Sequence, residues 1–173
     1  FHINRPQIDD AASAALLDNY LKMLDPGRIY FLQSDYDQFA QKRTLLDDEL
    51  RAGNVSFGYQ VYDQFLVRVR ARCDVVDRII DAPHDFTVQE TKPADYTKLP
   101  WASSQAELDE RWRKMIKYDL LITKIANEDL DKERDNLKKR YRNFRRMVEQ
   151  REKSDRLELY LTALTTVFDP HSS

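Results

Sequence analysis

One segment of the sequence, residues 62–80, repeats apolar side chains at the spacing of a single helical face. The apolar positions fall at i, i+3, i+4, i+7, i+11, i+14 and i+18, and they are Tyr62, Phe65, Leu66, Val69, Cys73, Val76 and Ile80. This spacing follows the 3.6-residue period of an α-helix rather than the two-residue period of a strand. The segment therefore predicts an amphipathic helix whose buried stripe includes Cys73.

Five other segments share this helical period. Their apolar sets are Leu17, Tyr20, Leu21 and Leu24; Phe39, Leu46 and Leu50; Leu108, Trp112, Met115, Ile116 and Leu120; Leu137, Tyr141, Phe144 and Val148; and Leu157, Tyr160, Leu161, Leu164 and Phe168. Charged residues make up 34% of the chain and only 3 glycines are present, which favours helices with solvated faces over a turn-rich sandwich. We predict an all-α fold of about six helices in one compact irregular bundle. The alternative at 173 residues is two small helical subdomains.

The first helix is expected over residues 9–23, followed by a tight turn at Asp25-Pro26-Gly27-Arg28. Pro26 presets φ at the second turn position, and glycine at the third accepts the positive φ of a type II turn. The apolar segment 29–32 should then insert into the core.

Capping residues indicate where other helices begin and end. Ser34 or Asp35 can cap the second helix, which should run to Gly53-Asn54, because a left-handed residue commonly follows a helix. Ser104 and Glu107 have the spacing of a capping box and start a later helix. Asp169-Pro170 closes the last helix, since proline disfavours a helical residue before it.

Two stretches lack a helical signal. Residues 83–103 predict an irregular loop or linker, with a short extended piece at Phe86-Thr87-Val88. Residues 127–133 predict a turn between two later helices.

Charge is distributed unevenly along the chain. Residues 1–106 carry 12 Lys/Arg against 16 Asp/Glu, a net −4, whereas residues 107–153 carry 15 against 11, a net +4. The basic cluster consists of Lys138, Lys139, Arg140, Arg142, Arg145 and Arg146. Tyr141 and Phe144, which interleave with it, lie on the apolar stripe, so a solvated or ion-paired helix face is the favoured interpretation. The functional alternative is a surface that binds an acidic partner through Lys138, Lys139, Arg142, Arg145 and Arg146.

The sequence offers no local signature of catalysis or metal binding. His2, His84 and His171 are far apart and form no zinc-type spacing, so neither a metal site nor another cofactor site is expected. No serine lies in a Gly-x-Ser-x-Gly elbow, and the adjacent residues 169–173 cannot converge as a triad. His84 beside Asp85 is interpreted as part of a solvated loop.

Cysteine usage and hydropathy argue against cysteine-dependent sites and against a membrane-spanning helix. The single cysteine, Cys73, excludes an internal disulfide and a multi-cysteine metal site. No apolar run approaches the roughly 20 residues needed to span a bilayer.

Three segments carry a resemblance to a known family. They are LDPGRIYFLQSD at 24–35, WASSQAELDERWRKMIKYDLL at 101–121 and FDPHSS at 168–173. Together they resemble the N-terminal helical region of tail-specific proteases, the periplasmic C-terminal-processing serine peptidases of bacteria. The resemblance covers essentially the whole chain.

The resemblance implies an organisation and a location. In that family a helical region precedes a PDZ domain that captures substrate C-termini, and a protease core with a serine nucleophile and a lysine base follows. Residues 1–168 would then be the N-terminal helical domain, and 169–173 would begin the connection to a PDZ domain absent from this sequence. No catalytic residue can be transferred to this chain, so we expect it to be inactive alone and periplasmic in its parent. Its implied partners are protein substrates held by their C-terminal tails, an adaptor protein, and the PDZ and protease domains.

Two other function classes remain as alternatives. A free-standing helical interaction module would have no attached enzyme, although the sequence at 169–173 looks like an interrupted connection. Nucleic-acid binding through residues 138–146 would show an affinity that falls steeply with salt, and the modest overall charge argues against it.

Overall fold

The computed structural model describes residues 8–169, which form seven α-helices and one 3₁₀ helix. The helices are α1 (Asp10–Leu24), α2 (Gln33–Ala40), α3 (Leu46–Arg51), α4 (Ser56–Asp81), η1 (Tyr96–Lys98), α5 (Gln105–Ile125), α6 (Leu130–Gln150) and α7 (Lys153–Phe168). Within the described range, the only β contact is an isolated parallel bridge between Leu32 and Ala102. The all-α fold class predicted from the periodicity is confirmed.

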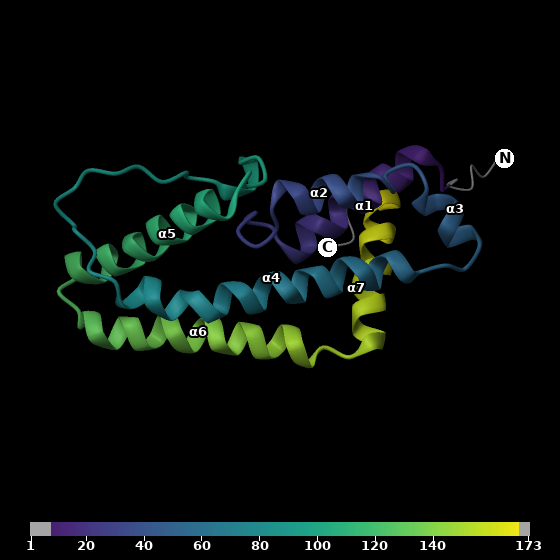
Figure 1. Cartoon of the computed structure of the whole chain (residues 1–173). Helices are drawn as coiled ribbons and strands as arrows, with labels where there is room; N and C mark the ends of the chain where they lie inside the picture. Colours follow the sequence, from purple (N-terminus) through teal and green to yellow (C-terminus); the bar gives the residue numbers. More distant parts are fainter. Residues whose placement is uncertain (1–7, 170–173) are drawn as a thin grey trace.

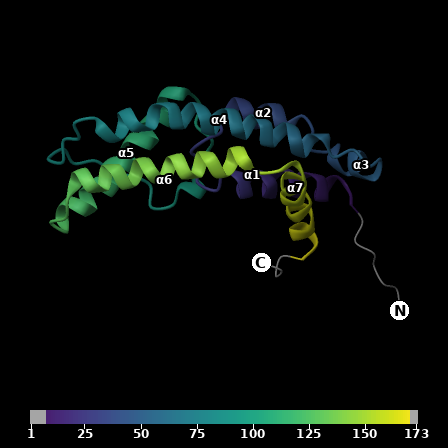
Figure 2. The same ribbon diagram turned by 90° about the horizontal axis from the view of Figure 1, so that it is seen from below.

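The helices form two regions, a head and an arm (Figure 1). We define the arm as residues 67–81 of α4 together with α5 and α6, and the head as α1, α2, α3, α7 and residues 56–66 of α4. The long helix α4 runs through both regions, and α6 lies alongside it. Figure 2 shows α7 turning away from α6 after residues 151–152, so that it packs mainly on α1.

The predicted apolar stripe of α4 forms part of the core. Tyr62, Phe65, Val69, Val76 and Ile80 are buried, as the spacing predicted. Cys73 is half-buried, and burial raises the pKa of its thiol to about 11. The helix therefore buries one face along nearly its whole length.

The segment between α1 and α2 inserts into the centre of this core, as predicted. The Tyr30 ring lies 5.7 Å from Phe65, 5.6 Å from Trp112 and 5.5 Å from Phe144, measured between centroids. Edge-to-face and offset contacts of this kind are favourable arrangements of aromatic rings. Tyr30 thus joins the head to the arm, because Trp112 and Phe144 belong to α5 and α6.

The predicted second helix, from residue 34 to residue 53, is divided in two. Turns at residues 41–45 separate α2 from α3, which raises the count from about six helices to seven. Leu46 is fully buried, and its backbone N–H donates to the hydroxyl of Ser13 at 2.9 Å instead of continuing a helix. A contact from α1 therefore lies at the start of α3. Gly53 has φ 75°, so the predicted left-handed residue at the end of this segment is confirmed.

Two local predictions were wrong. Residues 86–88 form a turn rather than an extended piece, because the Asp85 carboxylate accepts hydrogen bonds from the backbone and side chain of Thr87. The helix α6 begins at Leu130, so the predicted turn at 127–133 is shorter, with Asn127 at φ 55°. Asp129 caps α6 by accepting from the amides of Asp131 and Lys132.

The last helix buries only part of its predicted stripe. Tyr160 and Ala163 are buried against the head, but Leu161 and Phe168 remain 39% and 38% exposed. The sequence predicted one apolar face for this helix, but in the structure part of that face is exposed to solvent.

Candidate functional site

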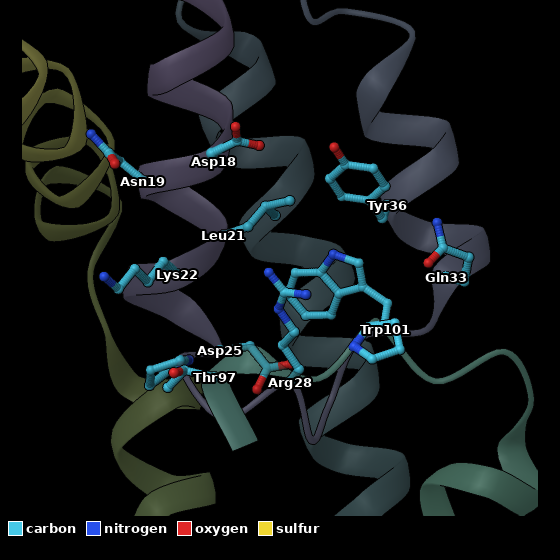
Figure 3. Close-up of a pocket in the computed structure, with 12 residues that line it drawn as sticks. Asp18, Asn19, Leu21, Lys22, Asp25, Arg28, Gln33, Tyr36, Thr97 and Trp101 are labelled. Atoms are coloured by element: carbon cyan, nitrogen blue, oxygen red, sulfur yellow. The ribbon is translucent and has the colours of Figure 1, made fainter. Parts of the chain in front are cut away.

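A pocket with a volume of about 610 Å³ lies in the head. Its walls come from α1, the turn after α1, the start of α2 and the end of the long loop (Figure 3). The lining residues used below are Asp18, Lys22, Arg28, Gln33, Tyr36 and Trp101. The volume falls within the roughly 300–1,000 Å³ typical of small-ligand sites.

The turn beside the pocket is built around the buried carboxylate of Asp25. Its oxygens accept from the backbone N–H groups of Ile29, Tyr30 and Phe31, each at 2.9 Å. Burial raises the pKa of Asp25, and these three amide hydrogen bonds act in the opposite direction. The carboxylate thus supplies acceptors that the buried apolar segment could not obtain from water.

This arrangement corrects the turn type expected from the sequence. Arg28 N–H donates to Asp25 C=O at 3.1 Å, so a turn is present, but the positive φ of 51° occurs at Arg28 and not at Gly27. A type II turn requires positive φ at its third residue. We attribute the difference to Asp25, whose side chain draws the following amides inward and forces the chain to bend at Arg28.

Trp101 forms the floor of the pocket. The Arg28 guanidinium lies 4.8 Å from the centre of its ring, and the Tyr36 ring stacks on the Trp101 ring at a centroid distance of 6.2 Å. Arg28 also donates to the carbonyl of Leu99. Trp101 is 8% exposed, so it packs in the core and also lines the pocket.

A second carboxylate, Asp35, fixes the start of α2. It accepts from the backbone N–H of Leu32 at 2.8 Å, so it caps the helix from a position inside the first turn. Arg68 of α4 donates two hydrogen bonds to it at 2.8 and 2.9 Å, and Gln64 donates a third at 2.8 Å. One of the two predicted capping residues therefore also ties α2 to α4.

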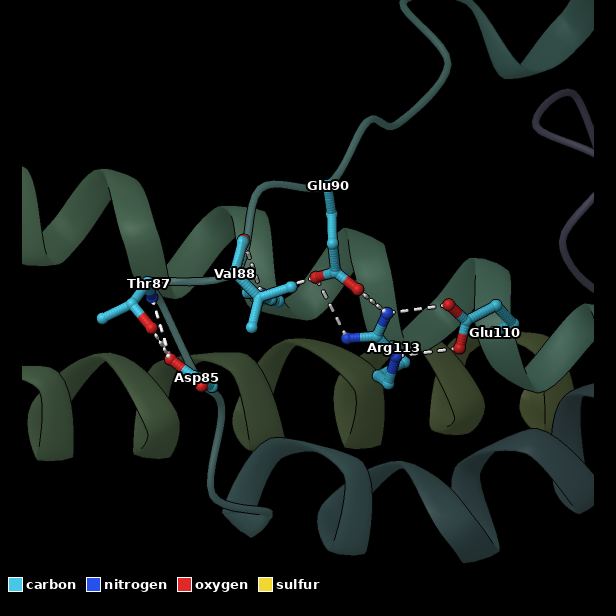
Figure 4. Close-up of polar contacts among 7 residues, drawn as sticks. Asp85, Thr87, Val88, Glu90, Glu110 and Arg113 are labelled. Carbon is cyan, nitrogen blue, oxygen red and sulfur yellow. Dashed lines mark hydrogen bonds and ion pairs between the residues drawn. The ribbon is translucent and has the colours of Figure 1, made fainter.

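The loop after α4 is tied to α5 by charge (Figure 4). Glu90 pairs with Arg113 and Lys117, and Arg113 also donates to Glu110 at 2.7 and 2.8 Å. The hydrogen bonds from Arg113 and Lys117 lower the pKa of Glu90 to about 2. This segment is therefore irregular in conformation but has specific anchors.

Three of the six residues of the basic cluster of α6 pair with acidic residues of α4. Four ion pairs, which we call the ladder, join α4 to α6. They are Arg70 with Glu149 at 2.8 Å, Asp74 with Arg145 at 2.7 Å, Asp77 with Arg142 at 3.1 Å, and Asp81 with Lys138 at 2.7 Å. Arg140 lies 3.5 Å from Asp119 of α5. Lys139 and Arg146 are exposed and make no ion pair within residues 8–169. The structure thus divides the predicted partner-binding residues into three ladder members and two free cations.

His84, Ser13 and Ser104 each make a hydrogen bond that serves the fold. His84 bonds to Ile79 C=O at 2.8 Å while Asp85 bonds to Thr87, so the two neighbours do not act as a pair. Ser13 binds the amide of Leu46, and Ser104 caps α5 by accepting from Glu107 N–H at 3.1 Å. His2 and residues 170–173 lie outside the described range. Within that range, no group of His, Cys, Asp and Glu could hold a metal ion.

Sequence reasoning did not identify Arg28 or Lys22 as pocket residues. The available signal was the combination of a tight turn and an unassigned tryptophan, Trp101, in a segment shared with a known family. The turn and Trp101 are far apart in sequence, so their contact could not be seen there. It arises only when the end of the loop joins α2 through the hydrogen bond from Gln33 N–H to Ala102 C=O at 2.8 Å.

Comparison with known proteins identifies the family. The family described as the tail specific protease N-terminal domain matches residues 1–173. This chain belongs to that family. A curated relative, the tail-specific protease of Haemophilus influenzae, is 30% identical over 173 residues, which cover 99% of this chain and 25% of the relative.

The chain therefore spans about a quarter of the length of that tail-specific protease. The resemblance seen in the sequence is confirmed, and the head and arm are features of a tail-specific protease N-terminal domain. None of the helices in residues 8–169 combines the length and the apolar character needed to cross a bilayer.

Proposed function

We propose that this chain is the non-catalytic N-terminal part of a periplasmic tail-specific serine protease that trims or degrades proteins from their C-termini. Its role is to hold the PDZ domain and the serine–lysine protease core of the same polypeptide in place, and to position substrates or dock an adaptor protein. The nucleophile and the base belong to the remaining part of that polypeptide. Family membership and the small share of the relative that the chain covers support this proposal.

The exposed stripe of α7 is the observation that carries the scaffold role. Leu157, Leu161, Leu164 and Phe168 fall at i, i+4, i+7 and i+11, which is the spacing of a buried helical face. Leu161 and Phe168 are nevertheless exposed, and Leu157 is only half-buried. An apolar helix face of this kind is characteristic of a contact surface for another domain. We assign that contact to the protease parts that follow α7 in the parent.

Association of two fragments tests this role. The 173-residue chain and the remainder of its parent protease are produced separately, and their affinity is measured by calorimetry. Leu161→Ser combined with Phe168→Ser should weaken the association by at least about tenfold, because each apolar anchor contributes on the order of 1 kcal/mol. The matched control is Val67→Ser combined with Ile125→Ser, two exposed apolar residues of α4 and α5.

Three results would contradict the proposal. The fragments would fail to associate, the α7 variant would behave like the control variant, or the 173-residue chain alone would hydrolyse peptides. The first two results would remove the scaffold role, and the third would remove the assignment of a non-catalytic part.

Docking of an acidic adaptor is the second role, and the two free cations of α6 support it. Lys139 and Arg146 are exposed and have no acidic partner within the described residues. Complementary charge at an interface mainly increases the association rate and its dependence on salt. Lys138, Arg142 and Arg145 belong to the same surface but are already paired with α4.

A further inference from the structure

The helix α5 carries a second apolar row, which we call the α5 row, on the side opposite to its buried stripe. The row consists of Tyr118, Leu121, Ile122 and Ile125, which fall at i, i+3, i+4 and i+7. Tyr118, Ile122 and Ile125 are 43%, 49% and 70% exposed. A helix with apolar side chains on two opposite sides is typical of a helix that is covered on both. The α5 row is therefore suited to a second packing contact.

The loop after α4 forms a wall beside the α5 row. Phe86 and Val88 of this loop line a pocket of about 80 Å³ together with Tyr118 and Leu121. The ion pairs of Glu90 hold the loop in this place (Figure 4). Small-molecule sites are typically roughly 300–1,000 Å³, so this pocket suits a single apolar side chain better than a separate ligand.

Three lysines without a carboxylate partner surround the row. Lys92, Lys114 and Lys124 form no ion pair within residues 8–169. The ammonium group of Lys92 lies 4.3 Å from the centre of the Tyr118 ring. Glu90, a carboxylate that lines the same pocket, is already paired with two other cations. The surface thus has an apolar centre and a positive rim, and a partner with an acidic rim would complement it.

The spacing of these features matches the dimensions of a helix. Lys114 and Lys124 are ten residues apart on α5, which corresponds to about 15 Å along its axis. An amphipathic helix that binds in a groove uses apolar anchors at i, i+3, i+4 and i+7, and it covers the same length. A bilayer could contact the exposed row, but it has no single side chain to place in the pocket beside the loop. The groove therefore favours a helix over a lipid surface.

We propose that the α5 row and the pocket beside it bind an acidic amphipathic helix of a partner protein. The apolar face of that helix packs on the α5 row, and one of its side chains enters the pocket. Carboxylates about ten residues apart on the partner pair with Lys114 and Lys124. This inference rests on the proposed function, because it names the chemistry of a docking partner, and it assigns that partner a surface separate from the free cations of α6.

The first test compares two fluorescent peptides that differ only in charge. Each has about 20 alanine-rich residues, enough to form a helix, with leucines at i, i+3, i+4 and i+7. Glutamates flank the leucines in one peptide, and lysines replace them in the other. Both ends are blocked, so neither peptide has a terminal carboxylate. We expect the acidic peptide to bind the 173-residue chain at least about tenfold more tightly by fluorescence anisotropy, and equal binding would overturn the proposal.

Apolar variants then test whether the peptide occupies the α5 row. Ile122→Ser combined with Ile125→Ser should lower the affinity at least about tenfold, because the central apolar contacts are lost. The matched control is Val67→Ser combined with Met147→Ser, two exposed apolar residues of α4 and α6. Circular dichroism establishes that both proteins are folded. An unchanged affinity in the folded α5 variant would refute the site.

A charge exchange tests the rim. Lys114→Glu combined with Lys124→Glu should reverse the preference, so that the basic peptide binds more tightly than the acidic one. Should this protein fail to fold, Lys114→Gln combined with Lys124→Gln should abolish the preference. Lys139→Glu combined with Arg146→Glu changes the free cations of α6 and should leave the preference for the acidic peptide intact. A preference that survives in the folded Lys114 and Lys124 variants would contradict the proposed ion pairs.

Two further measurements decide between this partner and other occupants. Sedimentation of the chain with phosphatidylglycerol vesicles, lost in the Ile122→Ser and Ile125→Ser variant, would assign the row to a lipid surface and overturn the proposal. Failure of the acidic peptide to bind the complete parent protease would show that the row is covered there, with the same consequence. Neither measurement involves α7, whose association with the protease parts is decided by its own experiment.

Discussion

The head and the arm both depend on carboxylates, but they use them in opposite ways. In the head, Asp25 and Asp35 are 1% and 3% exposed and accept hydrogen bonds from backbone amides. In the arm, the ladder carboxylates Asp74, Asp77 and Asp81 lie at the surface and face side chains of α6. The comparison teaches that burial, more than the number of ion pairs, decides how much a charged residue contributes to stability.

The ladder of the arm has a different use. On α4 its members are spaced by four, three and four residues, and their partners on α6 follow the same spacing in the opposite direction. Matched charges of this kind select one antiparallel register between the two helices. Below them, buried Val69, Val76, Leu137 and Tyr141 provide the apolar contacts.

The largest expected effect is in the head, at Asp25. Asp25→Ala removes the acceptor of three amides, two of which belong to the buried residues Tyr30 and Phe31. Each buried donor without a partner costs about 1–3 kcal/mol, so we expect a loss of about 4 kcal/mol in the free energy of unfolding. Urea denaturation measures it. Asp25→Asn, which keeps one acceptor oxygen, should lose less, and a loss below about 1 kcal/mol in the alanine variant would contradict the role given to Asp25.

The next effect concerns the contact between α4 and α7 in the head. A Cβ atom at Gly58 would lie 2.6 Å from the Tyr160 ring, and the Gly58 carbonyl accepts from the Tyr20 hydroxyl at 2.9 Å. Gly58→Ala should therefore destabilise the protein by about 2–3 kcal/mol through overpacking. Gly27→Ala is the matched control, because its Cβ would meet only Ile29 at an ordinary 3.7 Å. Thermal melts that fail to separate the two variants would show that Tyr160 can move away.

In the arm, a single rung of the ladder should contribute much less. A double-mutant cycle of Asp74→Asn with Arg145→Gln should give a coupling energy below about 1 kcal/mol, because Asp74 is exposed and Arg145 is only half-buried. A coupling as large as the loss at Asp25 would erase the distinction between the two regions.

The same arm variants sharpen the adaptor-docking proposal. Charge reversal at Lys139 and Arg146 should weaken binding of an acidic partner with an unchanged melting temperature. Reversal at Arg142 and Arg145 should also lower the melting temperature, since these residues pair with Asp77 and Asp74. Equal melting behaviour of the two sets would show that the ladder has no structural role.

The smallest effect should appear in acid, at the loop joining α4 to α5. The pKa of Glu90 is lowered from 4.5 to about 2 in the folded protein by Arg113 and Lys117. A lowered carboxyl pKa contributes stability that is complete above about pH 4.5 and is lost as the pH falls toward 2. The difference in unfolding free energy between the wild type and Glu90→Gln should therefore shrink between pH 6 and pH 3. A difference that stays constant over this range would mean that Glu90 does not anchor the loop.

Much of the fold could be predicted from the sequence because helical periodicity is a local property. The stripe from Tyr62 to Ile80 predicted α4, and the Ser104 cap predicted the start of α5. The pocket could not be predicted in the same way. Lys22, Arg28 and Trp101 come together only because the end of the loop pairs with the start of α2.

The sequence by itself determined the helical class, the insertion of Tyr30 and Phe31 into the core, and membership of the tail-specific protease N-terminal domain family. Tertiary structure decided where helices break, which cations find partners and which apolar face of α7 stays exposed. Ser13 begins α3, Asp25 moves the positive φ to Arg28, and α4 pairs with three of the six residues of the basic cluster. The physical reason is that periodicity follows from the helix geometry of neighbouring residues, whereas burial and ion pairing depend on residues distant in sequence.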